Sequence, residues 1–322
     1  MKMRIAAAGA GRMGRGLAVV YAYAGHPVDL IDLKARNDPA AALDEANAEI
    51  RETLNSLAAI GMIGADDADR IAARVTYVPL DAAETAIGKA DLIYEGVPET
   101  LDAKRAALAR ISAWADVGAI IASTTSTMLS DMLQEMVTGP ERFLNAHWLN
   151  PAFLVPLVEL SPGARTDSEV TSRLKHSLEE IGKIPVVCRA SPGFIVPRIQ
   201  ALAMNEAARL VEEGVASAED IDKATTYGLG FRFAVLGMLE FIDWGGGDIL
   251  HHASRYMTDA TGDPRFEAPE IVKRNMEDGR IGLRTGRGFL DYDGMDVPAY
   301  RRQRLAALAA MLRHMKLMRP PG

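Results

Sequence analysis

A glycine-rich turn near the start of the chain is the first group of residues with recognisable chemistry. It reads Gly9-Ala10-Gly11-Arg12-Met13-Gly14 and lies between a short apolar run and a helix-like stretch. In that context Gly9 permits a tight turn, Gly11 lets the backbone approach a pyrophosphate, and Gly14 permits close packing of a helix on a strand. The free N–H groups at the start of the helix would bind the phosphate charge. The pattern predicts a dinucleotide-binding site.

A carboxylate completes this expected site. Asp32 ends the next buried run, eighteen residues after Gly14. There it would accept hydrogen bonds from the adenosine ribose hydroxyls and repel a 2′-phosphate, so NAD is expected rather than NADP. Arg12 and Arg36 are nearby cations that would favour a 2′-phosphate and so oppose this preference. The alternative is a structural turn beside a strand-end carboxylate, and the combined context makes that alternative the weaker one.

Apolar runs and helical stretches alternate over the first part of the chain. Helices are expected at 17–24, 40–60 and 66–74, and strands at 3–8, 28–33, 73–79, 90–95, 119–122, 142–146 and 185–188. Strands that alternate with helices form parallel sheets with right-handed crossovers. The sequence therefore predicts an α/β fold with a Rossmann-type, doubly wound, mostly parallel sheet.

The pattern changes near residue 190 to longer helical segments. The first of these is expected to open at Ser191-Pro192 and to close at Gly214. We therefore expect an NAD-binding domain at residues 1–189 and an all-helical C-terminal domain at 190–322, for substrate binding and dimerisation. The basic segment 298–322 is expected to be a terminal helix packed on that domain, with a partner-binding amphipathic helix as the alternative.

The composition limits the possible partners and metal sites. The 322 residues are 48% apolar and 25% charged, as in ordinary globular proteins, and the net charge of −7 argues against nucleic acid or an anionic membrane as a partner. Cys188 is the only cysteine, which excludes an intrachain disulfide and fits a reducing cytoplasm. Asp248, His251 and His252 lie close in sequence, but adjacent histidines point in different directions on a helix. We expect no metal site.

Two segments in the middle of the chain carry a more specific signature. His147-Trp148-Leu149-Asn150-Pro151 is followed by Pro156-Leu157-Val158-Glu159-Leu160. These segments resemble the L-3-hydroxyacyl-CoA dehydrogenase family, whose hallmark is His-x-x-Asn-Pro followed by Leu-Val-Glu. The resemblance covers nearly the whole chain, including the glycine turn and the stretches at 95–99, 122–126, 191–196, 211–215, 220–222 and 279–292.

The resemblance implies NAD-dependent oxidation of a secondary alcohol, with a homodimer formed through the helical domain. His147 would be the base for the hydroxyl proton, and Glu159 would accept the other ring N–H. Ser126 would hydrogen-bond the substrate oxygen beside the cofactor, Asn150 would position the substrate and the histidine, and Glu95 would lie near the nicotinamide. Outside the family each of these residues has a structural alternative, as a packed histidine, a helix cap or a turn.

Departures from the family pattern bear on the substrate. Pro197 stands where the acyl-CoA enzymes usually have an active-site Asn, and a proline donates no backbone N–H. The stretch 228–237 is similar to the branch that contains lambda-crystallin and L-gulonate dehydrogenase, and there Arg232 would clamp a substrate carboxylate.

Three functions are therefore compared. A short 3-hydroxyacyl-CoA is the first expectation for the substrate. A free 3-hydroxycarboxylate, such as gulonate or carnitine, is the close alternative, and the acidic stretch 40–74 offers few cations for a CoA tail. A non-catalytic NAD-binding protein is the third possibility, and the complete set of expected catalytic residues argues against it.

Overall fold

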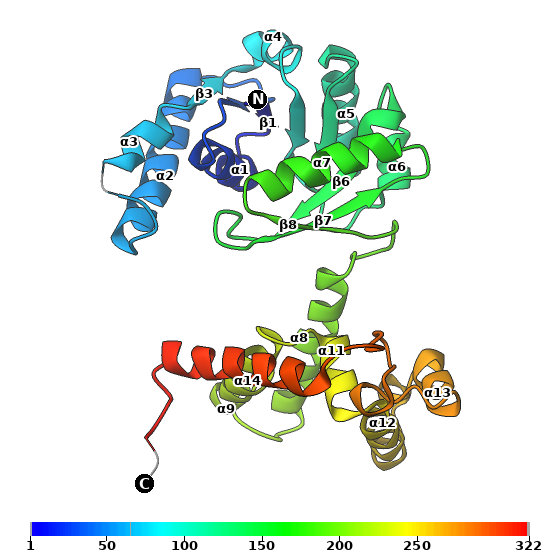
Figure 1. Ribbon diagram of the computed structural model, residues 1–322. Coiled ribbons are helices and arrows are strands. Elements are labelled where there is room, and N and C mark those ends of the chain that lie inside the picture. The colour runs from blue at the N-terminus through cyan, green and yellow to red at the C-terminus, as the bar shows by residue number, and fades with distance from the viewer. Residues whose placement is uncertain (1, 65, 321–322) are drawn as a thin grey trace. The chain divides into compact units, whose positions relative to one another are not determined.

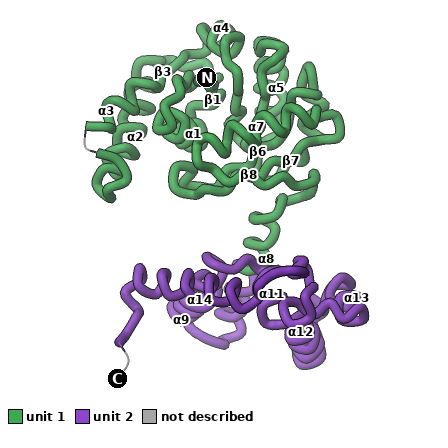
Figure 2. Tube along the Cα trace, in the orientation of Figure 1, with its two compact units in different colours: residues 1–203 green, residues 204–322 purple. Residues whose placement is uncertain are grey.

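The computed structural model of the chain describes residues 2–64 and 66–320 (Figure 1). The chain divides into two compact units, residues 1–203 and residues 204–322 (Figure 2). Within the described residues, no helix is both long enough and apolar enough to cross a lipid bilayer.

Unit 1 is built on an eight-stranded sheet in the order β3-β2-β1-β4-β5-β6-β7-β8. The strands are β1 (Ile5–Ala8), β2 (Val28–Ile31), β3 (Val75–Val78), β4 (Leu92–Glu95), β5 (Ile120–Ser123), β6 (Phe143–Trp148), β7 (Leu157–Pro162) and β8 (Ile184–Val187). The first six strands are parallel to one another. β7 is antiparallel to β6, and β8 is parallel to β7. This arrangement confirms the predicted Rossmann-type, mostly parallel sheet.

Helices cover both faces of this sheet. They are α1 (Arg12–Tyr23), α2 (Pro39–Ala59), α3 (Asp67–Ala72), η1 (Leu80–Ala82), α4 (Ala83–Ile87), α5 (Leu101–Trp114), α6 (Ser130–Gln134), η2 (Pro140–Arg142) and α7 (Ser168–Glu180). Side chains alternate between the two faces of a strand. Ile5 and Ala7 of β1 therefore share a buried cluster with α1, α2 and α7, while Ala6 and Ala8 share the opposite cluster with α4, α5 and α6.

Two local expectations need correction. Every strand except β7 overlaps a predicted run, and β7 was missed because the polar residues Glu159 and Ser161 occupy fully buried positions within it. The helix expected from Ser191 begins later, as α8 (Val196–Glu212), because Gly193 (φ 73°) and Phe194 (φ 47°) turn the backbone into the left-handed region.

Unit 2 is helical, as predicted for the C-terminal part of the chain, apart from two isolated β-bridges. Beyond α8 its elements are α9 (Ala218–Ala224), the π-helical turn η3 (Thr225–Gly230), α10 (Phe231–Phe233), α11 (Met238–Gly245), α12 (Gly247–Thr261), η4 (Pro264–Phe266), α13 (Glu270–Glu277), η5 (Leu283–Thr285) and α14 (Val297–His314). α14 is the predicted basic terminal helix, and none of its residues is fully buried. Residues 321 and 322 of that predicted segment lie outside the described residues.

Candidate active site

The glycine turn lies where the strand order of the sheet reverses, between β1 and β4. Ligands of doubly wound sheets bind in the crevice at such a switch point. Gly9 has φ 127°, and a Cβ there would lie 2.6 Å from the carbonyl oxygen of Gly96, which follows β4. A Cβ on Gly14 would clash with the carbonyl oxygen of Gly9, whereas one on Gly11 would meet no atom within 4 Å. Gly9 and Gly14 therefore build the turn, and Gly11 leaves open space beside it.

The remaining fingerprint residues begin helix α1. Arg12 is exposed, and Met13 is half-buried against the buried cluster that contains Ile5 and Ala7. A cavity of about 300 Å³ is lined by the glycine turn, Arg15, Asp32, Lys34, Arg36 and the loop after β4. The N-terminus of α1 opens toward this part of the crevice, where it is suited to a pyrophosphate.

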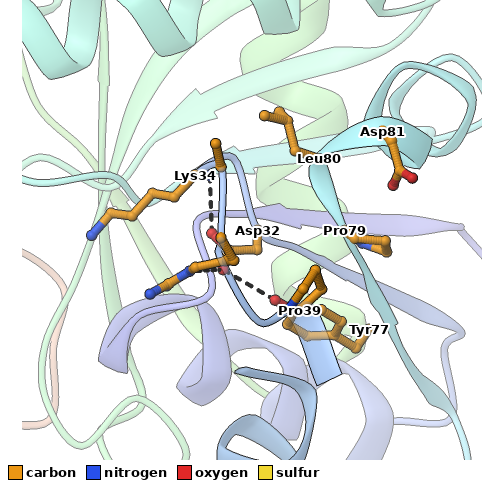
Figure 3. Close-up of a pocket in the computed structure, with 9 residues that line it drawn as sticks. Asp32, Lys34, Pro39, Tyr77, Pro79, Leu80 and Asp81 are labelled. Carbon is orange, nitrogen blue, oxygen red and sulfur yellow. Dashed lines mark hydrogen bonds and ion pairs between the residues drawn. The ribbon is translucent and has the colours of Figure 1, made fainter. Parts of the chain in front are cut away.

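Asp32 lies directly after β2 and is only 3% exposed. One carboxylate oxygen accepts from the backbone N–H of Lys34 (3.0 Å), and the other accepts from Arg36 Nε (2.7 Å) and the Tyr77 hydroxyl (3.0 Å), as Figure 3 shows for Lys34 and Tyr77. Burial alone would raise the pKa of Asp32, but these three hydrogen bonds outweigh it and hold the pKa below its ordinary value. Burial and the bond to Asp32 raise the pKa of Tyr77 to about 12.

His147 and Glu159 face each other across the antiparallel pair β6–β7, where they are register partners. Their side chains are in contact, with His147 Nδ1 2.7 Å from Glu159 Oε2. An ionised carboxylate only accepts hydrogen bonds, so Nδ1 carries a proton, and in the neutral imidazole Nε2 then keeps a lone pair. The ring of Phe194 stacks on the imidazole, with 5.3 Å between centroids. This arrangement fixes both the plane and the tautomer of His147.

Glu159 is fully buried, and its second oxygen is also satisfied. Oε1 accepts from the backbone N–H groups of Ile195 (2.9 Å) and Val196 (2.8 Å), at the start of α8. The N-terminus of a helix carries partial positive charge, so it stabilises the carboxylate at this position. The glycine at 193 and the turn before α8 thus serve to aim two donors at Glu159.

Ser126 lies in an exposed loop after β5 that is held by Glu99. Glu99 Oε1 accepts from the backbone N–H groups of Ser126 (3.0 Å) and Thr127 (3.3 Å) and from the Thr125 hydroxyl. Burial works to raise the pKa of Glu99, but the Thr125 hydroxyl, the charge of Lys104 and these N–H groups hold it below its usual value. Glu99 therefore orders the loop that presents the Ser126 hydroxyl.

Glu95 ends β4 and has no exposed surface. Its carboxylate accepts from Lys104 Nζ (2.9 Å to both oxygens), from the Ser123 hydroxyl (2.6 Å) and from the backbone N–H of Val97 (2.7 Å). The Lys104 ammonium, which is also buried, lies 3.5 Å from Glu99 as well. Both carboxylate oxygens of Glu95 are thus satisfied by protein donors, and Glu99 is the more exposed carboxylate of this network.

Asn150 is exposed and follows the strand that carries His147. It lines a cavity of about 340 Å³ together with Arg12, Arg15, Glu49, Thr53 and the segment 151–153. Since the carboxyl ends of parallel strands meet at one edge of a sheet, the structure brings Gly9, Asp32, Glu95, the Ser126 loop, and the His147 and Asn150 segment to the same edge of unit 1.

Arg232 belongs to unit 2, and its guanidinium already contacts neighbouring groups there. Its Nε donates to the carbonyl oxygen of Gly228 (2.8 Å), and its guanidinium lies over the ring of Phe241 at 4.7 Å. Pro197 is the second residue of α8, within the first turn where a proline is tolerated. Asp248 pairs with Arg284, and the described part of the chain contains no cluster of three or more His, Cys, Asp or Glu arranged for a metal ion.

Several residues of this site were missed in the sequence. Glu99 and Lys104 lie five residues apart on and before α5, a spacing that an exposed helix surface would also show. Asn145 is buried two residues before His147 and donates to the carbonyl oxygen of Met128 (2.9 Å), which ties β6 to the Ser126 loop. Only the apolar setting of Asn145 could have singled it out. Tyr77 lies on β3 and contacts Asp32 only because those strands pair in the sheet.

Comparison with known proteins agrees with this geometry. The NAD-binding domain of 3-hydroxyacyl-CoA dehydrogenase matches residues 4–191, and the C-terminal domain of that enzyme matches residues 193–292. The chain belongs to the 3-hydroxyacyl-CoA dehydrogenase family. It is therefore an NAD-binding oxidoreductase, and the resemblance drawn from the His147 and Glu159 segments is confirmed.

Relatives that are similar to this chain are named for different activities or roles. A 5-formyl-3-hydroxy-2-methylpyridine 4-carboxylate 5-dehydrogenase from Mesorhizobium japonicum is 29% identical over 97% of this chain and 98% of its own. Rabbit (Oryctolagus cuniculus) lambda-crystallin is 31% identical over 77% of this chain and 76% of its own. Among solved structures, a 3-hydroxyacyl-CoA dehydrogenase from Archaeoglobus fulgidus aligns with a TM-score of 0.77 and 30% identity, covering 98% of this chain and all of that one.

Proposed function

We propose that this chain interconverts a 3-hydroxyacyl compound and its 3-oxo form, with His147 as the proton-transferring group. The observation that supports the proposal is the buried His147–Glu159 pair at the edge of the sheet that holds the dinucleotide fingerprint. Bound NAD would accept the hydride from the carbinol carbon. Nε2 of His147 would take the hydroxyl proton as the carbonyl forms, and return it in the reverse direction.

The other residues of the site have supporting roles in this proposal. Glu159 would stabilise the imidazolium that forms when Nε2 gains the proton. Ser126 would hydrogen-bond the reacting oxygen, and Asn150 would position the substrate beside His147. Glu95, which is fully occupied by protein donors, would act at the nicotinamide end by holding Lys104 and through it Glu99.

The substrate is proposed to be a short 3-hydroxyacyl-CoA or a free 3-hydroxycarboxylate. The thioester is supported by the name of the Archaeoglobus structure, a 3-hydroxyacyl-CoA dehydrogenase that aligns over 98% of this chain. The free acid is supported by charge. The exposed face of α2 carries Glu45 and Glu49, and both form ion pairs with Arg15, with 3.2 Å between the Arg15 guanidinium and Glu45 Oε1. A CoA tail with three phosphate groups would gain little attraction there. In the free-acid case Arg232 would bind the carboxylate.

A comparison of two substrates under one set of conditions tests this function. NADH consumption is followed by absorbance with acetoacetyl-CoA and, in parallel, with free 3-oxo acids at the same enzyme concentration. Turnover of either class supports the proposal, and the ratio of kcat/KM values separates the thioester from the free acid. Absence of turnover on both, from protein that still binds NADH, would contradict the proposed 3-hydroxyacyl chemistry.

We also propose that the chain forms a homodimer through unit 2. Ile249 and Tyr256 lie two turns apart on one face of α12 and are 62% and 73% exposed. Exposed apolar surface of this kind is suited to cover by a second copy. Light scattering coupled to gel filtration should give twice the mass of one chain, and a monomeric mass at micromolar concentration would refute the dimer.

A further inference from the structure

An unpaired cation shares a cavity with the residue that is proposed to position the substrate. Arg12 and Arg15, which are one turn apart on α1, line the cavity of about 340 Å³ together with Asn150. Arg15 also lines the cavity of about 300 Å³ at the glycine turn, whereas Arg12 is not among the described residues that line that second cavity. Of the two arginines, Arg12 therefore belongs to the Asn150 cavity alone in this comparison.

The acids near this cavity are already paired with Arg15. Arg15 forms ion pairs with Glu45 and Glu49, and its side chain is only 14% exposed. Glu49 is the acid among the described residues that line the cavity. Arg12 is exposed, and it forms no hydrogen bond or ion pair with any residue that the structure describes. The lining therefore keeps an uncompensated positive charge, and Arg12 carries it.

Small residues keep space open in this cavity. A Cβ on Gly16 would lie 3.6 Å from the Cβ of Ala152, so α1 and the segment after Asn150 approach each other closely there. Gly16 and Ala152 both line the cavity. A larger side chain at either position would take up volume that is now available to a ligand beside Arg12.

We propose that Arg12 binds the carboxylate of a free 3-hydroxy or 3-oxo acid, and so selects this class of substrate over a CoA thioester. A guanidinium can hold a carboxylate through two parallel N–H···O bonds. One free cation matches the single charge of a carboxylate. The thioester has lost that carboxylate, and its CoA tail brings three phosphate groups whose charge one cation does not balance.

Asn150 connects Arg12 with the proposed site of proton transfer. It lines the cavity with Arg12, and it follows β6, the strand that carries His147. A small hydroxy acid bound there would have its carboxylate near Arg12 and its carbinol toward the histidine. This inference rests on the proposed function, since the carboxylate has to belong to the reacting substrate.

Arg232 is the other candidate for the same role in the free-acid case. Its Nε already donates to the carbonyl oxygen of Gly228, and its guanidinium lies over the ring of Phe241. Binding a carboxylate would compete with these contacts, whereas Arg12 has no such partner among the described residues. The two arginines are therefore compared directly in the test.

The test measures binding to the chain saturated with NADH, so that it needs no turnover. NADH cannot accept a hydride, so 3-hydroxybutyrate binds without reacting. Its dissociation constant is measured by fluorescence titration, alongside those of the neutral 3-hydroxybutyramide and of 3-hydroxybutyryl-CoA. Arg12→Met should weaken binding of 3-hydroxybutyrate about 30-fold, because a charged hydrogen-bonding partner is lost, and should change binding of the amide by less than about threefold.

Further variants separate a carboxylate contact from a general effect of charge. Arg12→Lys keeps the positive charge but not the paired donors, and it should weaken 3-hydroxybutyrate binding only about fivefold. Arg105→Met removes an exposed arginine of α5 and is the matched control, with wild-type binding of all three compounds expected. Arg232→Met should also leave 3-hydroxybutyrate binding within about threefold of wild type.

Three results would overturn the proposal. One is a wild-type chain that binds 3-hydroxybutyrate no more tightly than the amide, or an Arg12→Met variant that binds it as the wild type does. Another is an equal loss for 3-hydroxybutyryl-CoA in Arg12→Met, since Arg12 would then hold a phosphate of CoA. The third is a loss of NADH affinity as large as that for 3-hydroxybutyrate, which would assign Arg12 to the cofactor.

The proposed chemistry fails by a different result. Absence of NADH oxidation with both classes of 3-oxo substrate would contradict it, even if binding of 3-hydroxybutyrate depends on Arg12. Turnover of acetoacetyl-CoA in the wild-type chain, with no dependence of 3-hydroxybutyrate binding on Arg12, would keep the chemistry and remove the carboxylate site.

Discussion

Replacing Glu159 by Gln should disable His147 by changing which ring nitrogen carries the proton. The two backbone N–H groups of Ile195 and Val196 donate to one side-chain oxygen of residue 159. In the Gln variant these donors still need an acceptor, so the amide oxygen turns toward them and the NH₂ group faces the imidazole. His147 Nδ1 must then accept a hydrogen bond, and the proton moves to Nε2. The nitrogen that should take the substrate proton loses its lone pair.

The size of the effect follows from the contact between the two groups. His147 Nδ1 and Glu159 Oε2 are 2.7 Å apart, so the centres of the imidazolium and the carboxylate are about 4 Å apart. At an effective dielectric constant of about 20, this attraction is worth about 4 kcal/mol. Partial expression of that energy in the transition state, together with the wrong tautomer, predicts a fall in kcat of about 100- to 1000-fold.

The assay is steady-state NADH oxidation with whichever 3-oxo substrate the wild-type chain turns over. NADH affinity and the melting temperature are measured on the same samples, because Glu159 is buried and its replacement has to leave the fold intact. Glu179→Gln, which alters an exposed ion pair with Lys175 on α7, is the matched control and should keep wild-type kcat. A folded Glu159→Gln variant with kcat within about threefold of wild type would refute the tautomer argument.

Four further substitutions test other parts of the account. Gly14→Ala would place a Cβ against the Gly9 carbonyl, so it should lower the melting temperature and also lower the NADH affinity by about tenfold or more. In Gly11→Ala the added Cβ meets no protein atom within 4 Å, so this variant should lower the NADH affinity alone. An equal loss of melting temperature in the two variants would contradict this division. Glu99→Gln should lower the free energy of unfolding at neutral pH. Because folding depresses the pKa of Glu99, the difference in unfolding free energy between variant and wild type should shrink as the pH falls through and below about 4.3, the ordinary value for Glu. A difference that does not change with pH would mean that charge is not the cause. Lys183 is buried and donates to the carbonyl oxygens of Ala152 (2.7 Å) and Val155 (2.9 Å), which follow Asn150 in the chain. Lys183→Met should therefore lower the free energy of unfolding by about 2 kcal/mol in a denaturant titration and should raise KM for the substrate. An unchanged KM would show that Lys183 does not help to position the Asn150 segment.

The parts of the structure that could be predicted are those fixed by local chemistry. The glycine fingerprint and Asp32 obey constraints within a single strand-helix-strand unit, so residue type and spacing were sufficient to place them. The parts that could not be predicted depend on contacts between distant segments. Glu99 reaches Ser126 from a separate loop, and Tyr77 reaches Asp32 from a neighbouring strand.

Strand β7 shows the same limit in the fold itself. Glu159 and Ser161 are polar yet fully buried there, because β6, β8 and the start of α8 surround them. Polar residues in such positions weaken the apolar pattern by which a buried strand is recognised. The buried carboxylate that contacts His147 thus obscured the strand that carries it.

The most direct test of the account is the replacement of His147 by Ala, with turnover and NADH affinity measured on the same preparation. If His147 transfers the substrate proton, NADH binding should stay within about threefold of wild type, while kcat falls by about 1000-fold or more. Turnover that remains near the wild-type value would contradict the proposed role of His147 and, with it, the proposed chemistry of the site.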